Sequence, residues 1–119
     1  MVYSKEQADR IRGFLAGRRG VEEKSMFGGV GFLLGGNMCA GVLGENMIVR
    51  VEPSETDALL REPGAMPFSL GGRGRMTGWV LVAPSGTRDK AALQKWLSRA
   101  VAYASSLPRK RPKAAKAKR

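Results

Sequence analysis

The sequence predicts an α+β domain in which an antiparallel sheet of about five strands is flanked by an N-terminal and a C-terminal helix. The first observation is that short apolar runs separated by glycine-rich turns fill residues 26–51, as in tightly turned antiparallel strands. The second is that apolar residues recur at helical spacing on either side of this stretch, within residues 4–17 and 87–105. Helices at both ends of a strand meander are typical of an α+β fold.

The N-terminal helix is expected from about Ser4 to Gly17. Ser4 and Gln7 have the spacing of a capping box, in which a Ser at the N-cap is followed three residues later by Gln. The apolar residues that follow at helical spacing are Ala8, Ile11, Phe14 and Leu15. Residues 21–27 predict a weaker strand, and their charged side chains are typical of an exposed or edge strand.

Two glycine-containing turns organise the central stretch. Gly35-Gly36-Asn37 and Gly44-Glu45-Asn46 supply residues that accept positive φ between consecutive apolar runs. These turns set the register of the strands that they join. In residues 47–51 the apolar side chains alternate with Arg50, which predicts a strand with one buried face.

Two other apolar runs, residues 32–34 and 38–43, lack this alternation. Continuous apolar character suggests that part of the sheet is covered on both faces. A domain of this size has only two substantial helices with which to cover a sheet. We therefore expect a homodimer in which the partner covers the apolar second face of the sheet or its edge.

The second half of the chain alternates short elements with turn residues. A short helix is expected over residues 53–62, where Pro63-Gly64 stops it, and residues 63–78 are expected to be irregular because of their prolines and glycines. Residues 79–82 predict a short strand. The C-terminal helix is expected from residue 87 or 88 to about residue 105. Its apolar stripe consists of Leu93, Trp96, Leu97, Ala100, Val101 and Ala104.

With 119 residues, the chain is expected to form one domain, residues 1–108, followed by a disordered basic tail, residues 109–119. Cys39 is the only cysteine, so no intramolecular disulfide can form and a reducing, cytoplasmic setting is expected. The sequence has neither an apolar signal segment nor a run of ~20 apolar residues. We therefore expect no membrane association.

The basic tail carries the strongest charge signal in the sequence. Seven of the 21 basic residues lie in it and no acidic residue does, so most of the net charge of +11 comes from the tail. Because the tail has no aromatic side chain and no helical period, we expect it to contact phosphates and to bind DNA or RNA without sequence preference. The alternative is a terminus that only keeps the protein soluble. The candidate nucleic-acid-binding residues are Arg109, Lys110, Arg111, Lys113, Lys116, Lys118 and Arg119.

The sequence argues against an enzyme, and we expect no catalytic residue, cofactor or metal. It contains no histidine, which removes the commonest general base and a common metal ligand. Cys39 has apolar neighbours and is expected to be a buried structural thiol. Gly29-Val30-Gly31 precedes a strand rather than a helix N-terminus, so phosphate binding is not expected there. Residues 72–75 are expected to form a solvated loop.

Two long motifs resemble the TfoX N-terminal-domain family: MFGGVGFLLGGNMCAGV at residues 26–42 and NMIVRVEP at residues 46–53. REPGAMPF at residues 61–68 and GRGRMTGWVLV at residues 72–82 are similar to later motifs of the family in the same order. Together with the C-terminal helix, the resemblance covers roughly residues 4–108.

The resemblance implies an α+β domain similar to the secretion-chaperone-like dimeric folds, in the bacterial cytoplasm and without enzymatic activity. Full-length members are regulators of natural competence that add a helical C-terminal domain. This sequence has a short basic tail in that place, so we expect a stand-alone domain. Our leading hypothesis is a non-enzymatic regulatory or scaffold module, associated with transcription, that binds a protein partner through its globular part and nucleic acid through its tail. The alternative is a protein-protein interaction module with an inert solubilising tail.

Overall fold

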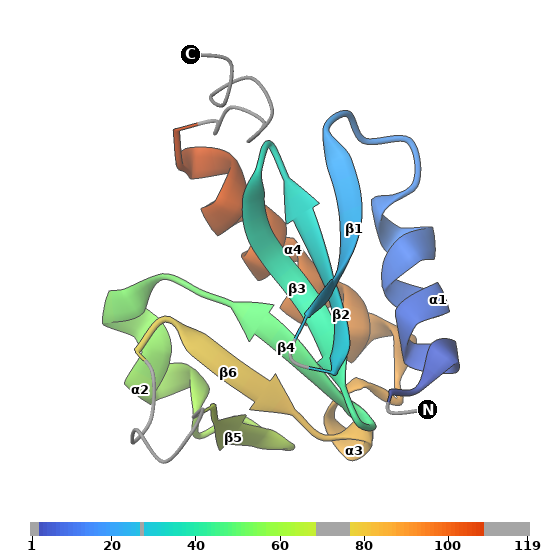
Figure 1. The fold of residues 1–119 in the computed structure, drawn as a ribbon. Coiled ribbons are helices and arrows are strands. Elements are labelled where there is room, and N and C mark those ends of the chain that lie inside the picture. Colours follow the sequence, from blue (N-terminus) through green and yellow to red (C-terminus); the bar gives the residue numbers. More distant parts are fainter. Residues whose placement is uncertain (1–2, 27, 69–76, 109–119) are drawn as a thin grey trace.

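The structure is a computed structural model that describes residues 3–26, 28–68 and 77–108. It is an α+β domain built on one six-stranded antiparallel sheet with the strand order β1-β2-β3-β4-β6-β5 (Figure 1). The strands are β1 (Val21–Met26), β2 (Gly29–Leu34), β3 (Asn37–Leu43), β4 (Asn46–Arg50), β5 (Ala65–Pro67) and β6 (Trp79–Val82). The fold class predicted from the sequence is confirmed, with one more strand than the expected five.

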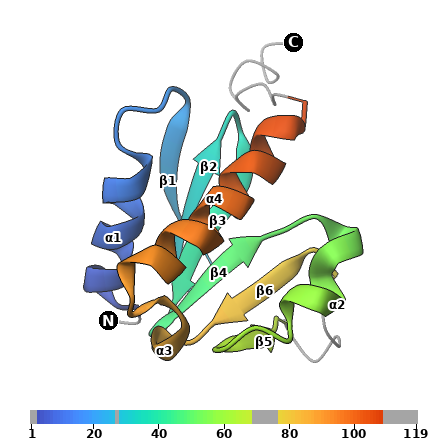
Figure 2. The same ribbon diagram turned by 180° about the vertical axis from the view of Figure 1, so that it is seen from behind.

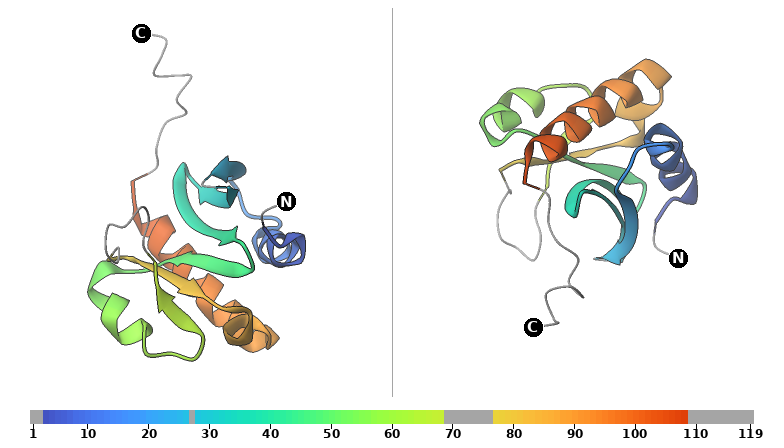
Figure 3. Two further views of the ribbon diagram at one scale, coloured as in Figure 1. Left: turned by 60° about the horizontal axis from the view of Figure 1, so that its bottom comes forward. Right: turned by 90° about the horizontal axis from the view of Figure 1, so that it is seen from above.

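The helices are α1 (Lys5–Leu15), α2 (Thr56–Leu59) with the preceding 3-10 turn η1 (Pro53–Glu55), α3 (Pro84–Thr87) and α4 (Lys90–Ser106). The long helix α4 runs diagonally across one face of the sheet (Figure 2). Helix α1 lies beside α4 and packs against β3 and α4. Strands β1, β2 and β3 curl away from the plane of β4 and β6 (Figure 3).

The main hydrophobic core lies between the sheet and helices α1 and α4. The strands supply alternate side chains to it, as expected for a sheet with one face against helices. The buried strand residues are Val30, Phe32, Cys39, Ala40, Val42, Met47, Val49, Val80 and Val82, and the buried helix residues include Ile11, Leu15, Leu93, Trp96, Leu97 and Ala100. The expected apolar stripe of the C-terminal helix is thus confirmed as its core-facing side.

A β-bulge explains one break in the alternation of the run at residues 38–43, and the apolar side chains of Met38 and Leu43 on the opposite face of the sheet explain the rest. Phe32 pairs with Ala40, but the next residue of β2, Leu33, pairs with Met38. Cys39 is therefore the extra residue of the bulge, and both Cys39 and Ala40 are completely buried. Sequence alternation fails here because the bulge shifts the register by one residue.

The two glycine turns predicted from the sequence are confirmed. Gly35 and Gly36 join β2 to β3 with φ angles of 63° and 84°, and Gly44 has a φ of 64° between β3 and β4. Both Gly35 and Gly36 are left-handed, as a two-residue hairpin turn requires when it follows the twist of its strands. The hairpins place β2, β3 and β4 side by side, as expected.

The structure corrects several expected boundaries. Residues 63–78 are not irregular throughout, because Ala65–Pro67 pairs with β6 as the short edge strand β5. The expected helix over residues 53–62 is shorter and begins with the 3-10 turn η1. The C-terminal helix begins at Lys90, later than expected, since a separate turn of helix, α3, starts at Pro84, where proline suits the first helical position.

The expected capping box at the start of α1 forms only in part. The Ser4 hydroxyl accepts a hydrogen bond from the Gln7 backbone N–H at 3.2 Å, so Ser4 is the N-cap. The Gln7 side chain does not return to the N-cap, because its amide donates instead to the Glu45 carbonyl oxygen at 3.2 Å. Gln7 therefore joins α1 to the β3–β4 turn. Helix α1 ends at Leu15, before the expected Gly17.

Candidate functional site

The face of the sheet that points away from α1 and α4 is lined with apolar side chains. We call this set the open face; its members are Leu33, Met38, Leu43, Ile48, Met66, Trp79 and Leu81. Six of them are partly exposed, and only Ile48 is fully buried, at 2% exposure. Ile48 and Phe68, whose ring centroid lies 6.3 Å from that of Trp79, are buried but lie outside the main core. In the described part of the chain, both long helices lie on the other face (Figures 1 and 2).

Two glycines and an arginine shape the open face. Gly31 and Gly41 pair with each other between β2 and β3, and the end of the Met38 side chain lies over Gly41, 3.1 Å from where a Cβ would be. At the far end, the Arg50 guanidinium lies over the Trp79 ring at 5.1 Å from its centroid. Arg50 shares a face with Trp79, as the alternation of its strand predicts, and at the end of the strand its guanidinium also reaches the Tyr103 ring of α4, 5.5 Å from the centroid.

The edges of the sheet are less suited to binding another chain than the open face is. The edge strand β1 presents exposed polar side chains, Glu22, Glu23, Lys24 and Ser25. At the opposite edge, β5 has only three residues and ends at Pro67, which has no backbone N–H to donate. Charged, short and proline-containing edges discourage strand addition.

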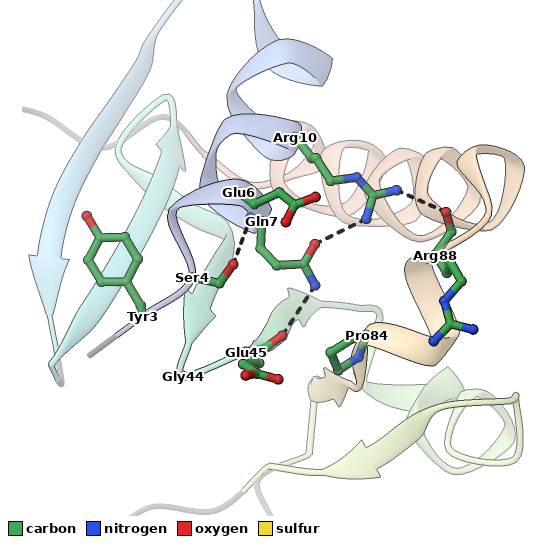
Figure 4. Close-up of a pocket in the computed structure, with 9 residues that line it drawn as sticks. All are labelled: Tyr3, Ser4, Glu6, Gln7, Arg10, Gly44, Glu45, Pro84 and Arg88. Carbon is green, nitrogen blue, oxygen red and sulfur yellow. Dashed lines mark hydrogen bonds between the residues drawn. The ribbon is translucent and has the colours of Figure 1, made fainter. Parts of the chain in front are cut away.

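A groove of about 860 Å³ lies between α1, the β3–β4 turn and α3 (Figure 4). The side chains of Ser4, Gln7 and Arg10, which line it, already bind one another or the backbone. Arg10 donates from Nη1 to Gln7 Oε1 at 3.1 Å and from Nη2 to the Thr87 carbonyl oxygen at 2.7 Å. Gln7, at 6% exposure, also binds the β3–β4 turn. These contacts hold α1 to the turn and to α3, which is a structural role.

A second groove, of about 400 Å³, lies at the opposite end of α1. Arg18 and Arg19 line it from the α1–β1 turn, and Asn37 lines it from the start of β3. The Arg18 guanidinium lies over the Phe14 ring at 5.4 Å from its centroid. Asn37, at 3% exposure, donates from Nδ2 to the Pro108 carbonyl oxygen at 2.9 Å. Sequence reasoning missed this groove.

Cys39 is a buried thiol, as expected. It has no exposed surface, and burial raises the pKa of its thiol to about 11, an effect that the positive charge of Arg18 only partly offsets. At neutral pH such a thiol is protonated, which makes it a poor nucleophile. The bulge that places Cys39 in the core therefore also keeps it unreactive.

The seven tail residues predicted to bind nucleic acid, from Arg109 to Arg119, lie outside the described residues, as do Arg73 and Arg75 of the predicted solvated loop. Gly29-Val30-Gly31 was expected to precede a strand, but it forms the first half of strand β2 itself. Among residues 3–26, 28–68 and 77–108, no group of three or more His, Cys, Asp or Glu residues could hold a metal ion. Within the same ranges, no helix is long and apolar enough to cross a membrane.

The fold and its surfaces define a small α+β domain with helices on one face of an antiparallel sheet and an apolar surface on the other. The family model of the TfoX N-terminal domain matches residues 14–104, and the chain belongs to this family of regulatory domains. The match confirms the resemblance noted in residues 26–42 and 46–53. No curated protein and no solved structure matches the chain.

Proposed function

We propose that this protein is a non-enzymatic regulatory or scaffold module of the cytoplasm that binds a second copy of itself through the open face and nucleic acid through its basic tail. The observation that carries the proposal is the open face. Six partly exposed apolar side chains lie together on four strands, β2, β3, β5 and β6, opposite the face that the helices cover. Contiguous exposed apolar patches of this kind mark protein-binding surfaces.

A second copy of the chain fits the open face better than a charged partner does. The contact between two identical chains places the same surface on both sides, so a charged patch would face its own charge. Among the described residues, the centre of the open face carries no charge; Arg50 lies at its far end, with its guanidinium against Trp79 and against Tyr103 of α4. Glu22 and Lys24, of opposite sign, lie at its rim on β1, as is usual for the polar rim of an interface.

Membership of a regulatory family and the charge of the tail support the second half of the proposal. The tail places seven cations and no acid in 11 residues. Contacts from such a segment to phosphates do not depend on base sequence. A role associated with transcription would follow from holding the dimer on DNA. The burial of Cys39 and the absence of histidine from the sequence favour a binding function over a catalytic one.

Light scattering tests the dimer. At tens of micromolar, we expect a mass of twice the chain mass of 12.8 kDa. Leu81→Glu places a charge in the open face and should give a monomer, whereas the matched variant Ser98→Glu, on the exposed side of α4, should remain a dimer. A monomeric native protein would refute the dimer, and a dimeric, folded Leu81→Glu variant would mean that the contact lies elsewhere.

Salt titration tests the tail. If all seven cations contact duplex phosphates, log K should fall against log salt with a slope of about −6. A full-length variant with the seven cations replaced by Gln should lose most of this dependence on salt. If the two proteins bind unrelated duplexes equally well, or if neither binds at low salt, the tail is a solubilising terminus. A protein-protein interaction module would then be the better account.

A further inference from the structure

The groove lined by Arg18 and Arg19 is positively charged and lies where the tail begins. It is bounded by the α1–β1 turn, the β2–β3 hairpin and the last turns of α4; the residues that line it are Arg18, Arg19, Leu34, Gly35, Asn37, Val101, Ala104, Ser105 and Leu107. None of them is acidic. We propose that this basic groove binds a phosphodiester of the nucleic-acid backbone, next to the phosphates that the tail contacts. The inference rests on the proposed nucleic-acid binding and adds a site on the folded domain.

The two arginines of the basic groove differ from Arg12 and Arg99, which bind carboxylates. Arg12 donates to the Glu23 carboxylate at 2.6 Å and Arg99 donates to the Glu62 carboxylate at 2.8 Å, so their charges are paired. Within the described residues, neither Arg18 nor Arg19 meets a carboxylate. In the described part of the chain, the Arg18 guanidinium lies over the Phe14 ring and makes no hydrogen bond, which leaves its N–H groups available to an anion. Both arginine side chains are exposed.

The backbone holds these arginines in place. Gly17 and Gly20, on either side of the pair, have φ angles of 88° and 77°, in the left-handed region that glycine tolerates. The Gly20 carbonyl oxygen accepts a hydrogen bond from the Gly35 N–H at 3.1 Å, which ties the α1–β1 turn to the β2–β3 hairpin. The arginines are thus presented by a fixed turn, and a guanidinium has the geometry to bind phosphate oxygens in pairs.

The same hairpin fixes the point where the tail begins. Asn37 is buried and donates its amide to the carbonyl oxygen of Pro108, the last described residue, at 2.9 Å. Arg109 follows directly, and consecutive Cα atoms are ~3.8 Å apart. The first tail cation is therefore connected to the wall of the basic groove. A duplex whose backbone lies in the groove would have its neighbouring phosphates within reach of the tail.

The test uses the full chain, a duplex of unrelated sequence and salt from ~50 to ~200 mM. Two further phosphate contacts raise the expected slope of log K against log salt from about −6 to about −8. Arg18→Gln/Arg19→Gln should return the slope to about −6, so the loss of affinity across this salt range becomes about tenfold smaller. The matched control, Arg88→Gln/Lys90→Gln, removes two exposed charges beyond the other end of α1 and should leave the slope near −8.

A slope that changes equally in the groove variant and in the control would refute the basic groove while leaving the tail as the binding segment. Conversely, if the seven-Gln tail variant binds like the native protein and the groove variant does not, the groove is the site and the tail proposal fails. Absence of any binding by the native protein at ~50 mM salt would refute both. Arg19→Gln alone keeps the contact between Arg18 and Phe14 and should change the slope by about 0.9. That variant therefore tests the groove even if the double variant is poorly folded.

Discussion

The thiol of Cys39 should make the unfolding free energy of the domain fall as the pH rises above 9. The substitution Cys39→Ala should remove this part of the pH dependence. In the folded protein burial raises the pKa of this thiol from 9.0 to about 11. The unfolded chain loses the proton first as the pH rises, so the contribution of the buried, neutral thiol is fully present below pH 9. It is then lost progressively as the pH rises toward 11.

The size of the effect follows from the shift. A difference of two pKa units corresponds to about 3 kcal/mol of unfolding free energy once both states have titrated, and about 2 kcal/mol by pH ~10.5. Because Cys39 has no exposed surface, solvent screening does not reduce this contribution. The loss is a large fraction of the stability of an ordinary domain of this size.

Urea unfolding of the native protein and of Cys39→Ala, from pH 8 to ~10.5, measures this contribution. The variant should be less stable at pH 8 by about 1 kcal/mol, and the difference should shrink or reverse as the pH rises. All other ionisable groups are the same in the two proteins, so their effects cancel in the comparison. Parallel stability curves for the two proteins would refute the buried, neutral thiol and with it the bulge that places Cys39 in the core.

Two further predictions concern packing. Arg99 and Glu62 form a two-pronged ion pair with N–O distances of 3.1 and 2.8 Å. A double-mutant cycle to Ala should give a coupling free energy of about 1 kcal/mol that falls in ~1 M salt. A coupling free energy near zero would mean that the pair does not hold α4. Gly29→Ala should destabilise the domain by about 2 kcal/mol or more, because its Cβ would lie 2.1 Å from the Val42 carbonyl oxygen. Gly13→Ala, in an open part of α1, should stabilise the domain by up to ~1 kcal/mol. If Gly29→Ala and Gly13→Ala changed the midpoint of thermal unfolding equally, the β2–β3 register would be contradicted.

The sheet could be predicted from the sequence because glycine turns determine it locally. The left-handed Gly35 and Gly36 join adjacent strands with only two residues, so the pairing of β2 with β3 is specified by neighbouring sequence. The short elements β5 and α3 could not be predicted in this way. Each has three or four residues, too few for a period, and β5 forms because β6 is available to pair with it.

The surfaces were predicted less completely than the fold. The open face was foreseen in part, since apolar runs without alternation imply side chains on both faces of the sheet. The basic groove was missed because it joins three segments far apart in the chain, residues 18–19, 34–37 and 101–107. A cue was present in the consecutive Arg18 and Arg19 between two glycines, but such a pair is also common at a helix C-terminus. The tail residues lie outside the described part of the chain.

The most direct test of the proposed function is the mass of the complex that the protein forms with a short duplex of about 20 base pairs at low salt. Light scattering should find two chains of 12.8 kDa on each duplex for the native protein. Leu81→Glu should still bind, but with one chain, since the charge disrupts the open face and leaves the tail and the basic groove intact. One chain per duplex in the native complex, or no complex at ~50 mM salt, would contradict a dimeric module held on nucleic acid.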